Sequence, residues 1–265
     1  MSDELNNVKN RFLPIPESAE KGLEHEAKIT DFEILKELGS GSFGNVYLVR
    51  HKETKAAEKF AEAAVSKRKG TLVMAFDWPC HGEDAKTKLT LSDCDAYITL
   101  CTKYLAELAG AENVSVCATS FGAYLILKYI AEHGNPFRRI ALRSPAVTMY
   151  QLITQNIMNE ENLRAVARGK EAQVGFDRKV RVRAEFLREL EEADITKLDY
   201  MEYSDNILIL HGMKDEIVPV DTALKFADDN LIESITFEKA DHRFIDQKIM
   251  SEAIAKMIDF LFAES

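Results

Sequence analysis

Three residues of the types used in nucleophilic catalysis occur along the chain in the order Ser120, Asp215 and His242. A histidine can accept the proton of a serine hydroxyl while an aspartate holds the imidazole by its Nδ1–H. Each residue comes shortly after an apolar run of strand length. Parallel strands end at one edge of a sheet, so strands in those runs would bring the three side chains to the same place. The order and positions predict a nucleophile–acid–base triad that works through a covalent intermediate.

The serine lies in the segment 118–122, Ala-Thr-Ser-Phe-Gly, between a predicted strand and a predicted helix. A serine there sits on a tight turn that projects its hydroxyl above the sheet, and small residues two places before and after it let strand and helix approach. The usual first glycine of this pattern is Ala118, which adds one methyl group. At the positive end of the following helix, the backbone N–H of Phe121 can stabilise an oxyanion.

The acid and the base lie in loops after two later strands. Asp215 belongs to the segment 211–219, His-Gly-Met-Lys-Asp-Glu-Ile-Val-Pro. Glu216 is its local rival, but the turn that ends in Val218-Pro219 favours Asp215 as the residue that holds the imidazole. His242 follows the last predicted strand and completes the predicted triad.

Helical patterns alternate with the apolar runs over most of the chain. Short runs buried on both faces predict an α/β fold, with a mostly parallel central sheet covered by helices on both faces. Strands are predicted at 32–38, 46–49, 71–76, 113–118, 139–142, 206–210 and 234–237, and helices at 53–69, 92–108, 121–132 and 247–262. The alternation stops over about residues 146–203, which are expected to form a lid. A basic stretch of the lid, 178–183, could receive an acidic substrate, or it could be a solvated face paired with nearby glutamates such as Glu185 and Glu189.

From about residue 55 to 265 the chain resembles the α/β-hydrolase superfamily. Beside the three residues and their order, His81-Gly82 within the segment 76–84 is similar to the family's D-x-x-G-H-G-x-S pattern. The resemblance implies a serine carboxylesterase or acyl hydrolase in a domain over 56–265. It also implies a small-molecule ester or acyl substrate and no cofactor.

Residues 29–55 resemble the glycine-rich hairpin of a protein kinase. Gly39, Gly41, Gly44 and Val46 fit the loop that covers the phosphates between two antiparallel strands. No V-A-I-K-like, H-R-D-x-x-x-x-N or D-F-G segment follows, which argues against phosphoryl transfer. A kinase-like fragment joined to a hydrolase is the hypothesis that accounts for both resemblances.

The junction leaves one part of the predicted site open. The hydrolase family usually takes a second oxyanion N–H from a His-Gly pair after its third strand, and no such pair occurs before residue 81. Strand 45–50 with loop 51–54 could replace it, which we prefer because a helix follows at once; glycine loop 39–44 is the alternative. Losing one donor lowers the rate by about 10²–10³. A catalytically impaired hydrolase-fold binding protein is therefore the alternative function, and a kinase-related nucleotide binder is a third.

Composition narrows the class of protein. A formal net charge of −10 argues against a nucleic-acid partner. No apolar run is long enough to cross a membrane, and the acidic N-terminus does not resemble a signal peptide. Residues 1–28 are polar and are expected to form a flexible tail. The four cysteines lack a metal-ligand spacing, so we expect no metal, reduced buried thiols and a cytoplasmic location.

Overall fold

The computed structural model describes residues 33–41, 44–50, 55–76, 78, 88–175 and 179–264. Up to residue 58 it describes only the backbone. The predicted tail, 1–28, and loop 51–54 lie outside the described residues, as does most of the segment 76–84.

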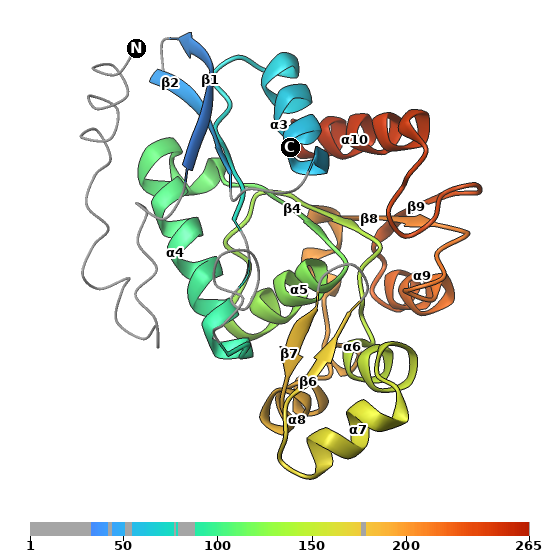
Figure 1. Cartoon of the computed structure of the whole chain (residues 1–265). Helices are drawn as coiled ribbons and strands as arrows, with labels where there is room; N and C mark the ends of the chain where they lie inside the picture. The colour runs from blue at the N-terminus through green and yellow to red at the C-terminus, as the bar shows by residue number, and fades with distance from the viewer. Residues whose placement is uncertain are drawn as a thin grey trace.

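Four parallel strands form the central sheet of the structure (Figure 1). They lie in the order β4-β5-β8-β9, and each neighbouring pair is parallel. Their bounds are β4 (Val116–Thr119), β5 (Ile140–Arg143), β8 (Ile207–Gly212) and β9 (Glu233–Phe237). The predicted mostly parallel sheet is therefore confirmed, and its carboxyl ends meet at one edge.

Successive residues of the strands face opposite sides of the sheet and pack into two separate cores. Ile207 and Ile209 of β8 belong to one core, whereas Leu208 and Leu210 belong to the other. This period of two is the reason why the central strands β5 and β8 are mainly apolar over their whole length, because both of their faces are covered. β9, at the edge of the sheet, is more exposed and carries the polar residues Glu233, Ser234 and Thr236.

Helices cover both faces, as predicted (Figure 1). One face carries α4 (Leu91–Ala109), α5 (Phe121–His133) and α9 (Val220–Asp229). The opposite face carries α3 (Lys55–Lys67) and α10 (Gln247–Leu261), which contact each other. A short 3-10 turn, η3 (Ala111–Asn113), replaces the start of the predicted strand 113–118. Within the described residues, no helix is both long and apolar enough to cross a membrane.

The N-terminal part of the described chain forms a small sheet in the order β1-β2-β3. β1 (Glu33–Gly41) and β2 (Gly44–Arg50) form an antiparallel hairpin, as the kinase resemblance predicts. β2 also pairs in parallel with β3 (Val73–Met74). The strand and helix that we prefer as the source of the second oxyanion donor correspond to β2 and α3. The prediction for 71–76 was wrong in length, because only two of its residues form ladder bonds.

A separate group of elements fills the predicted lid. It consists of α6 (Met149–Gln151), the π-helical η4 (Leu152–Ile157), α7 (Glu160–Ala167), β6 (Ala172–Val174), β7 (Val180–Val182), α8 (Ala184–Glu192), η5 (Ile195–Lys197) and η6 (Met201–Asn206). β6 and β7 form an antiparallel pair, and β7 contains residues 180–182 of the basic stretch. Arg181 and Arg183 both pair with Glu171 across these strands. A solvated, paired face therefore describes these arginines, although their partner differs from the expected glutamates.

Candidate active site

Ser120 lies at the end of β4 with φ 55° and ψ −119°, a conformation that non-glycine residues rarely adopt. Backbone hydrogen bonds hold it there: its N–H donates to the Arg143 carbonyl (3.0 Å), and its own carbonyl accepts from Tyr124 (3.2 Å) and Ala146 (3.3 Å). A serine just before a helix often caps it through its hydroxyl. The Ser120 side chain makes no such bond. Its hydroxyl is therefore left for other chemistry.

Close packing surrounds the turn at Ser120. A Cβ atom on Gly122 would lie 3.3 Å from Nε1 of Trp78, so the glycine lets the indole lie directly against α5. The ring of Phe121 stacks on Tyr124 with 6.1 Å between centroids and meets Phe186 of α8 edge-on at 6.1 Å. These contacts fix the residue whose N–H begins α5. The first N–H groups of a helix have no partner within it, so this one can bind an anion.

Asp215 and His242 form a direct hydrogen bond, 2.8 Å between Oδ2 and Nδ1. The other carboxylate oxygen, Oδ1, accepts from the backbone N–H groups of Ile217 (3.0 Å) and Val218 (2.8 Å). The side chain of Asp215 is fully buried, and that of His242 is 14% exposed. Because a carboxylate can only accept, Nδ1 of His242 carries the hydrogen, and Nε2 is left as the basic nitrogen.

The pKa of Asp215 follows from these contacts. Burial on its own raises the pKa, because it disfavours the charged form. Hydrogen bonds from His211, His242 and the Val218 amide outweigh burial, and they hold the pKa of Asp215 far below its ordinary range. The carboxylate therefore stays ionised under ordinary conditions and can stabilise a cationic imidazole.

A second histidine contacts the same acid, and the sequence analysis did not single it out. His211, at the end of β8, is completely buried, and its Nε2 lies 3.2 Å from Oδ2 of Asp215. The same Nε2 lies 3.1 Å from the carbonyl oxygen of Val218. The signal for this residue was its position, since it lies in the same short segment as the acid, four residues before it.

Backbone contacts join the acid loop to the histidine loop. The N–H of Lys214 donates to the Ala240 carbonyl (2.9 Å), and that of Met213 donates to the Phe237 carbonyl (2.9 Å). Gly212 makes this approach possible, because a Cβ atom there would collide with the Ala240 carbonyl group. The two loops are thereby held at the distance at which Asp215 and His242 can bond.

The structure brings the three predicted residues to the carboxyl edge of one parallel sheet, after β4, β8 and β9. It places Asp215 against His242, whereas the rival Glu216 is exposed. Within the described residues, no hydrogen bond joins the Ser120 hydroxyl to His242. Such bonds are often long in enzymes without substrate and tighten only when substrate binds.

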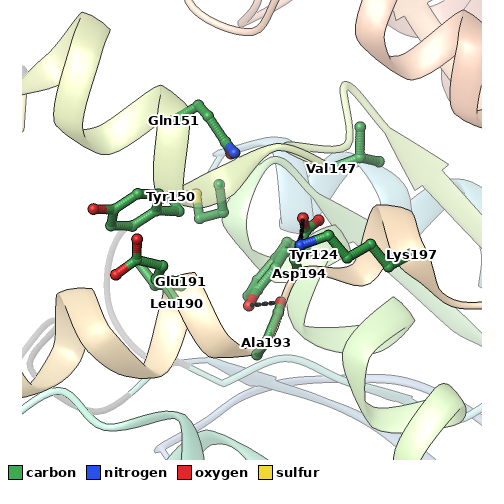
Figure 2. Close-up of a pocket in the computed structure, with 10 residues that line it drawn as sticks. Tyr124, Val147, Tyr150, Gln151, Leu190, Glu191, Ala193, Asp194 and Lys197 are labelled. Atoms are coloured by element: carbon green, nitrogen blue, oxygen red, sulfur yellow. Dashed lines mark hydrogen bonds and ion pairs between the residues drawn. The ribbon is translucent and has the colours of Figure 1, made fainter.

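A small cavity of about 170 Å³ lies between α5, α6 and the lid helix α8 (Figure 2). Val147, Met149 and Leu190 give it apolar walls, while charged side chains such as Glu191 add polar ones. The complete lining is Tyr124, Val147, Met149, Tyr150, Gln151, Leu190, Glu191, Ala193, Asp194 and Lys197. None of the three predicted residues lines it. One of its lining residues, Val147, follows Ala146, whose N–H donates to the Ser120 carbonyl (3.3 Å).

One acidic cluster has ligands close enough for a cation: Asp95, Glu132 and His133. The ammonium of Lys128 already lies 2.7 Å from Asp95 and 2.6 Å from Glu132. That lysine neutralises the carboxylates, so the cluster is explained as an ion-pair network between α4 and α5.

Comparison with known proteins separates the two resemblances. The serine/threonine-protein kinase Nek1 of Toxoplasma gondii (strain ATCC 50611 / Me49) is 39% identical over 46 residues. Those residues are 17% of this chain, and the chain spans only 3% of the length of that kinase. The kinase likeness is therefore confined to a short segment.

Solved structures share the fold at low sequence identity. A crystallised protein from Agrobacterium vitis S4, classed provisionally as a hydrolase, is 14% identical with a TM-score of 0.64, over 87% of this chain and 99% of its own. Est1E of Butyrivibrio proteoclasticus with ferulic acid bound is 16% identical with a TM-score of 0.59, over 81% and 86%. These likenesses confirm the α/β-hydrolase fold. Residues 63–265 match the family model of the prolyl oligopeptidase family. With most of its length covered by that match, the chain belongs to the prolyl oligopeptidase family and is a hydrolase of the α/β type.

Proposed function

We propose that the protein is a serine hydrolase that cleaves a carboxylic ester or a related acyl bond through an acyl-enzyme on Ser120. The observation that carries the proposal is the pairing of a strained serine, whose hydroxyl caps nothing, with a bonded Asp215–His242 pair at the same sheet edge. A residue held in a costly backbone conformation needs support from its surroundings, and such residues concentrate at active sites.

In the proposed reaction His242 Nε2 accepts the hydroxyl proton of Ser120 as Oγ attacks the carbonyl carbon of the substrate. The same imidazolium then gives its proton to the leaving oxygen, which departs as an alcohol. Water then attacks the acyl carbon and loses a proton to His242, which returns that proton to Ser120 Oγ as the acyl–oxygen bond breaks and the acid leaves. Throughout, Asp215 keeps the hydrogen of His242 on Nδ1 and stabilises the imidazolium.

Phe121 supplies the first oxyanion donor in this proposal. Its N–H begins α5, where the partial positive charge of the helix favours a developing oxyanion. The second donor stays a prediction from the sequence, in residues 51–54 between β2 and α3, which lie outside the described residues.

The cavity under the lid is proposed to receive the part of the substrate that does not react. Its volume of about 170 Å³ suits a small group with both apolar and polar parts. An amide or peptide bond is the second candidate target, because the chain belongs to the prolyl oligopeptidase family. Free thiols at Cys94, Cys101 and Cys117 support a reducing compartment such as the cytoplasm.

A fluorophosphonate probe followed by intact mass measurement and peptide mapping tests the nucleophile. We expect one label, on Ser120, and none in the Ser120→Ala variant. Ser144 offers a matched control, because it also follows a strand with positive φ (46°) but is completely buried. The Ser144→Ala variant should label like the natural protein.

Substrate panels distinguish the candidate bonds. p-Nitrophenyl esters of increasing acyl length should be hydrolysed by the natural protein and not by Ser120→Ala. If the probe labels Ser120 and the protein cleaves peptide p-nitroanilides but no p-nitrophenyl ester, a peptidase would be favoured. A well-folded protein that neither labels nor hydrolyses, yet binds ester analogues, would favour the impaired binding protein instead.

A further inference from the structure

The side chain of His211 contacts the loop that carries the acid. Its side chain is fully buried, and its Nε2 faces both Asp215 and Val218 of that loop. On the other side of the ring, Nδ1 is buried and has no hydrogen-bond partner. Since His211 lies within β8, one residue before its end, the imidazole connects the sheet to the loop that must hold the carboxylate still.

The neighbours of His211 determine which ring nitrogen carries the hydrogen. The Val218 carbonyl and the ionised carboxylate of Asp215 can only accept hydrogen bonds. Nε2 is therefore the donor, and one hydrogen is shared between the two oxygens at 3.1 Å and 3.2 Å. Asp215 Oδ2 thus receives donors from two imidazoles, because Nδ1 of His242 reaches the same oxygen at 2.8 Å.

We propose that His211 is a positioning residue for the hydrolytic reaction, which holds Oδ2 of Asp215 from the sheet side and limits the charge that this oxygen offers to His242. The inference rests on the proposed function, since it assigns a role in the same site. Two amides fix Oδ1, and two imidazoles fix Oδ2, so the carboxylate cannot rotate away from His242.

Charge sharing gives this role a consequence that packing alone does not have. The groups that act on Asp215 are His211 and His242 in direct contact, with Arg143 of β5 at longer range, itself influenced by Asp241. A donor on Oδ2 withdraws negative charge from the carboxylate. Removing that donor leaves more charge facing His242, so His242 holds its proton to higher pH and becomes a usable base only there.

Two amide substitutions of equal polarity separate positioning from packing. In His211→Gln the side-chain amide reaches close to the place of Nε2 and can still donate to Asp215. In His211→Asn the shorter amide reaches only the place of Nδ1. We expect His211→Asn to lower kcat by up to about 10²-fold with KM unchanged, and to move the acid limb of the kcat/KM profile to higher pH. His211→Gln should keep the natural profile and most of kcat.

Active-site titration with the fluorophosphonate probe normalises both variants to folded, reactive enzyme. Equal losses in the two variants, or a loss in His211→Asn that disappears after normalisation, would show a packing histidine and overturn the proposal. A second measurement needs no activity. In natural protein labelled with ¹⁵N-histidine, long-range ¹H–¹⁵N spectra should show His211 with its hydrogen on Nε2, assigned by the loss of its signals in His211→Gln.

The two measurements keep the proposals separate. If the natural protein hydrolyses no substrate, the proposed function fails, and the inference fails with it as a statement about catalysis. The ¹⁵N spectra still decide the contact itself: a hydrogen on Nδ1 of His211 would overturn the proposed donation to Asp215, whatever the activity.

Discussion

The carbonyl carbon of Ala240 lies 2.8 Å from the point that a Cβ atom on Gly212 would occupy. No real side chain tolerates that distance, and the obstacle is backbone, which cannot turn aside. The same Ala240 carbonyl accepts the N–H of Lys214. The loops of Asp215 and His242 can therefore contact each other only because residue 212 is glycine.

Gly212→Ala should separate these loops. We expect a loss of about 1–3 kcal/mol in the free energy of unfolding from overpacking, together with a fall in kcat because the Asp215–His242 bond is stretched. Gly134→Ala is the control: its φ of 81° also disfavours a side chain, but nothing lies within 4 Å of the added methyl. With ψ 162°, Gly134 lies in a region that is essentially confined to glycine, so Gly134→Ala should cost about 1–3 kcal/mol and leave kcat unchanged. Normal kcat in Gly212→Ala would contradict the steric argument.

The strain at Ser120 should be measurable as stability. Ser120→Ala removes the hydroxyl and keeps the strain, whereas Ser120→Gly removes both. Because glycine adopts φ 55° and ψ −119° without a Cβ clash, we expect Ser120→Gly to be more stable than Ser120→Ala by about 1 kcal/mol, even after the entropy that glycine loses on folding. Urea unfolding of the two inactive variants makes the comparison. Equal stability would mean that the turn is not strained.

The low pKa of Asp215 should make the stability of the protein depend on pH in a particular way. Its native pKa lies far below the value of about 3.9 that an aspartate has in an unfolded chain. A group with a depressed native pKa stabilises fully above the unfolded value, and the contribution is lost as pH falls toward the native value. The difference in free energy of unfolding between natural protein and Asp215→Asn should therefore shrink as the pH falls below about 4. Ser120→Ala, which removes no titrating group, should give a flat difference, and a flat difference for Asp215→Asn would refute the prediction.

A side-chain hydrogen bond joins the lid helix α8 to the start of α4. Oε2 of Glu189, on α8, accepts the N–H of Leu91 at the start of α4 (2.8 Å). Glu189→Ala should lower the free energy of unfolding by about 1 kcal/mol and speed hydrogen exchange in α8. Glu185→Ala is the matched control on the same helix, because that carboxylate is 68% exposed and 4.0 Å from Arg188. Its effect should stay within about 0.5 kcal/mol. Equal exchange rates in the two variants would argue against this role of Glu189.

The central sheet could be predicted because its signal is local. The central strands β5 and β8 are buried runs of mainly apolar residues, the two faces of the sheet pack into separate cores, and the helices between the strands have regular periodicity. The order of Ser120, Asp215 and His242 then followed from the rule that parallel strands end at one edge. Boundaries were less accurate at β3, where the run 71–76 is apolar but only Val73–Met74 has a strand partner.

The contacts within the site depend on distances that no run of residues encodes. His211 reads as the end of a strand, and only the folded loop brings its Nε2 to Asp215. The partner of Arg181 was likewise missed, because Glu171 reaches it across a hairpin and not along one helix. The lid elements are short and irregular, so they carry weak periodicity and could be expected only as an interruption of the pattern.

The parallel unit β8–α9–β9 carries two of the three predicted residues by itself (Figure 1). Asp215 and His242 are 27 residues apart, whereas Ser120 precedes both by far more chain. The entropic free energy of closing a loop rises with its length, by about 0.6 kcal/mol for each doubling. The acid–base half can therefore assemble early and locally during folding, and the nucleophile joins it only when β4 docks. A substitution that keeps β4 from docking would therefore leave the Asp215–His242 pair formed but separated from Ser120.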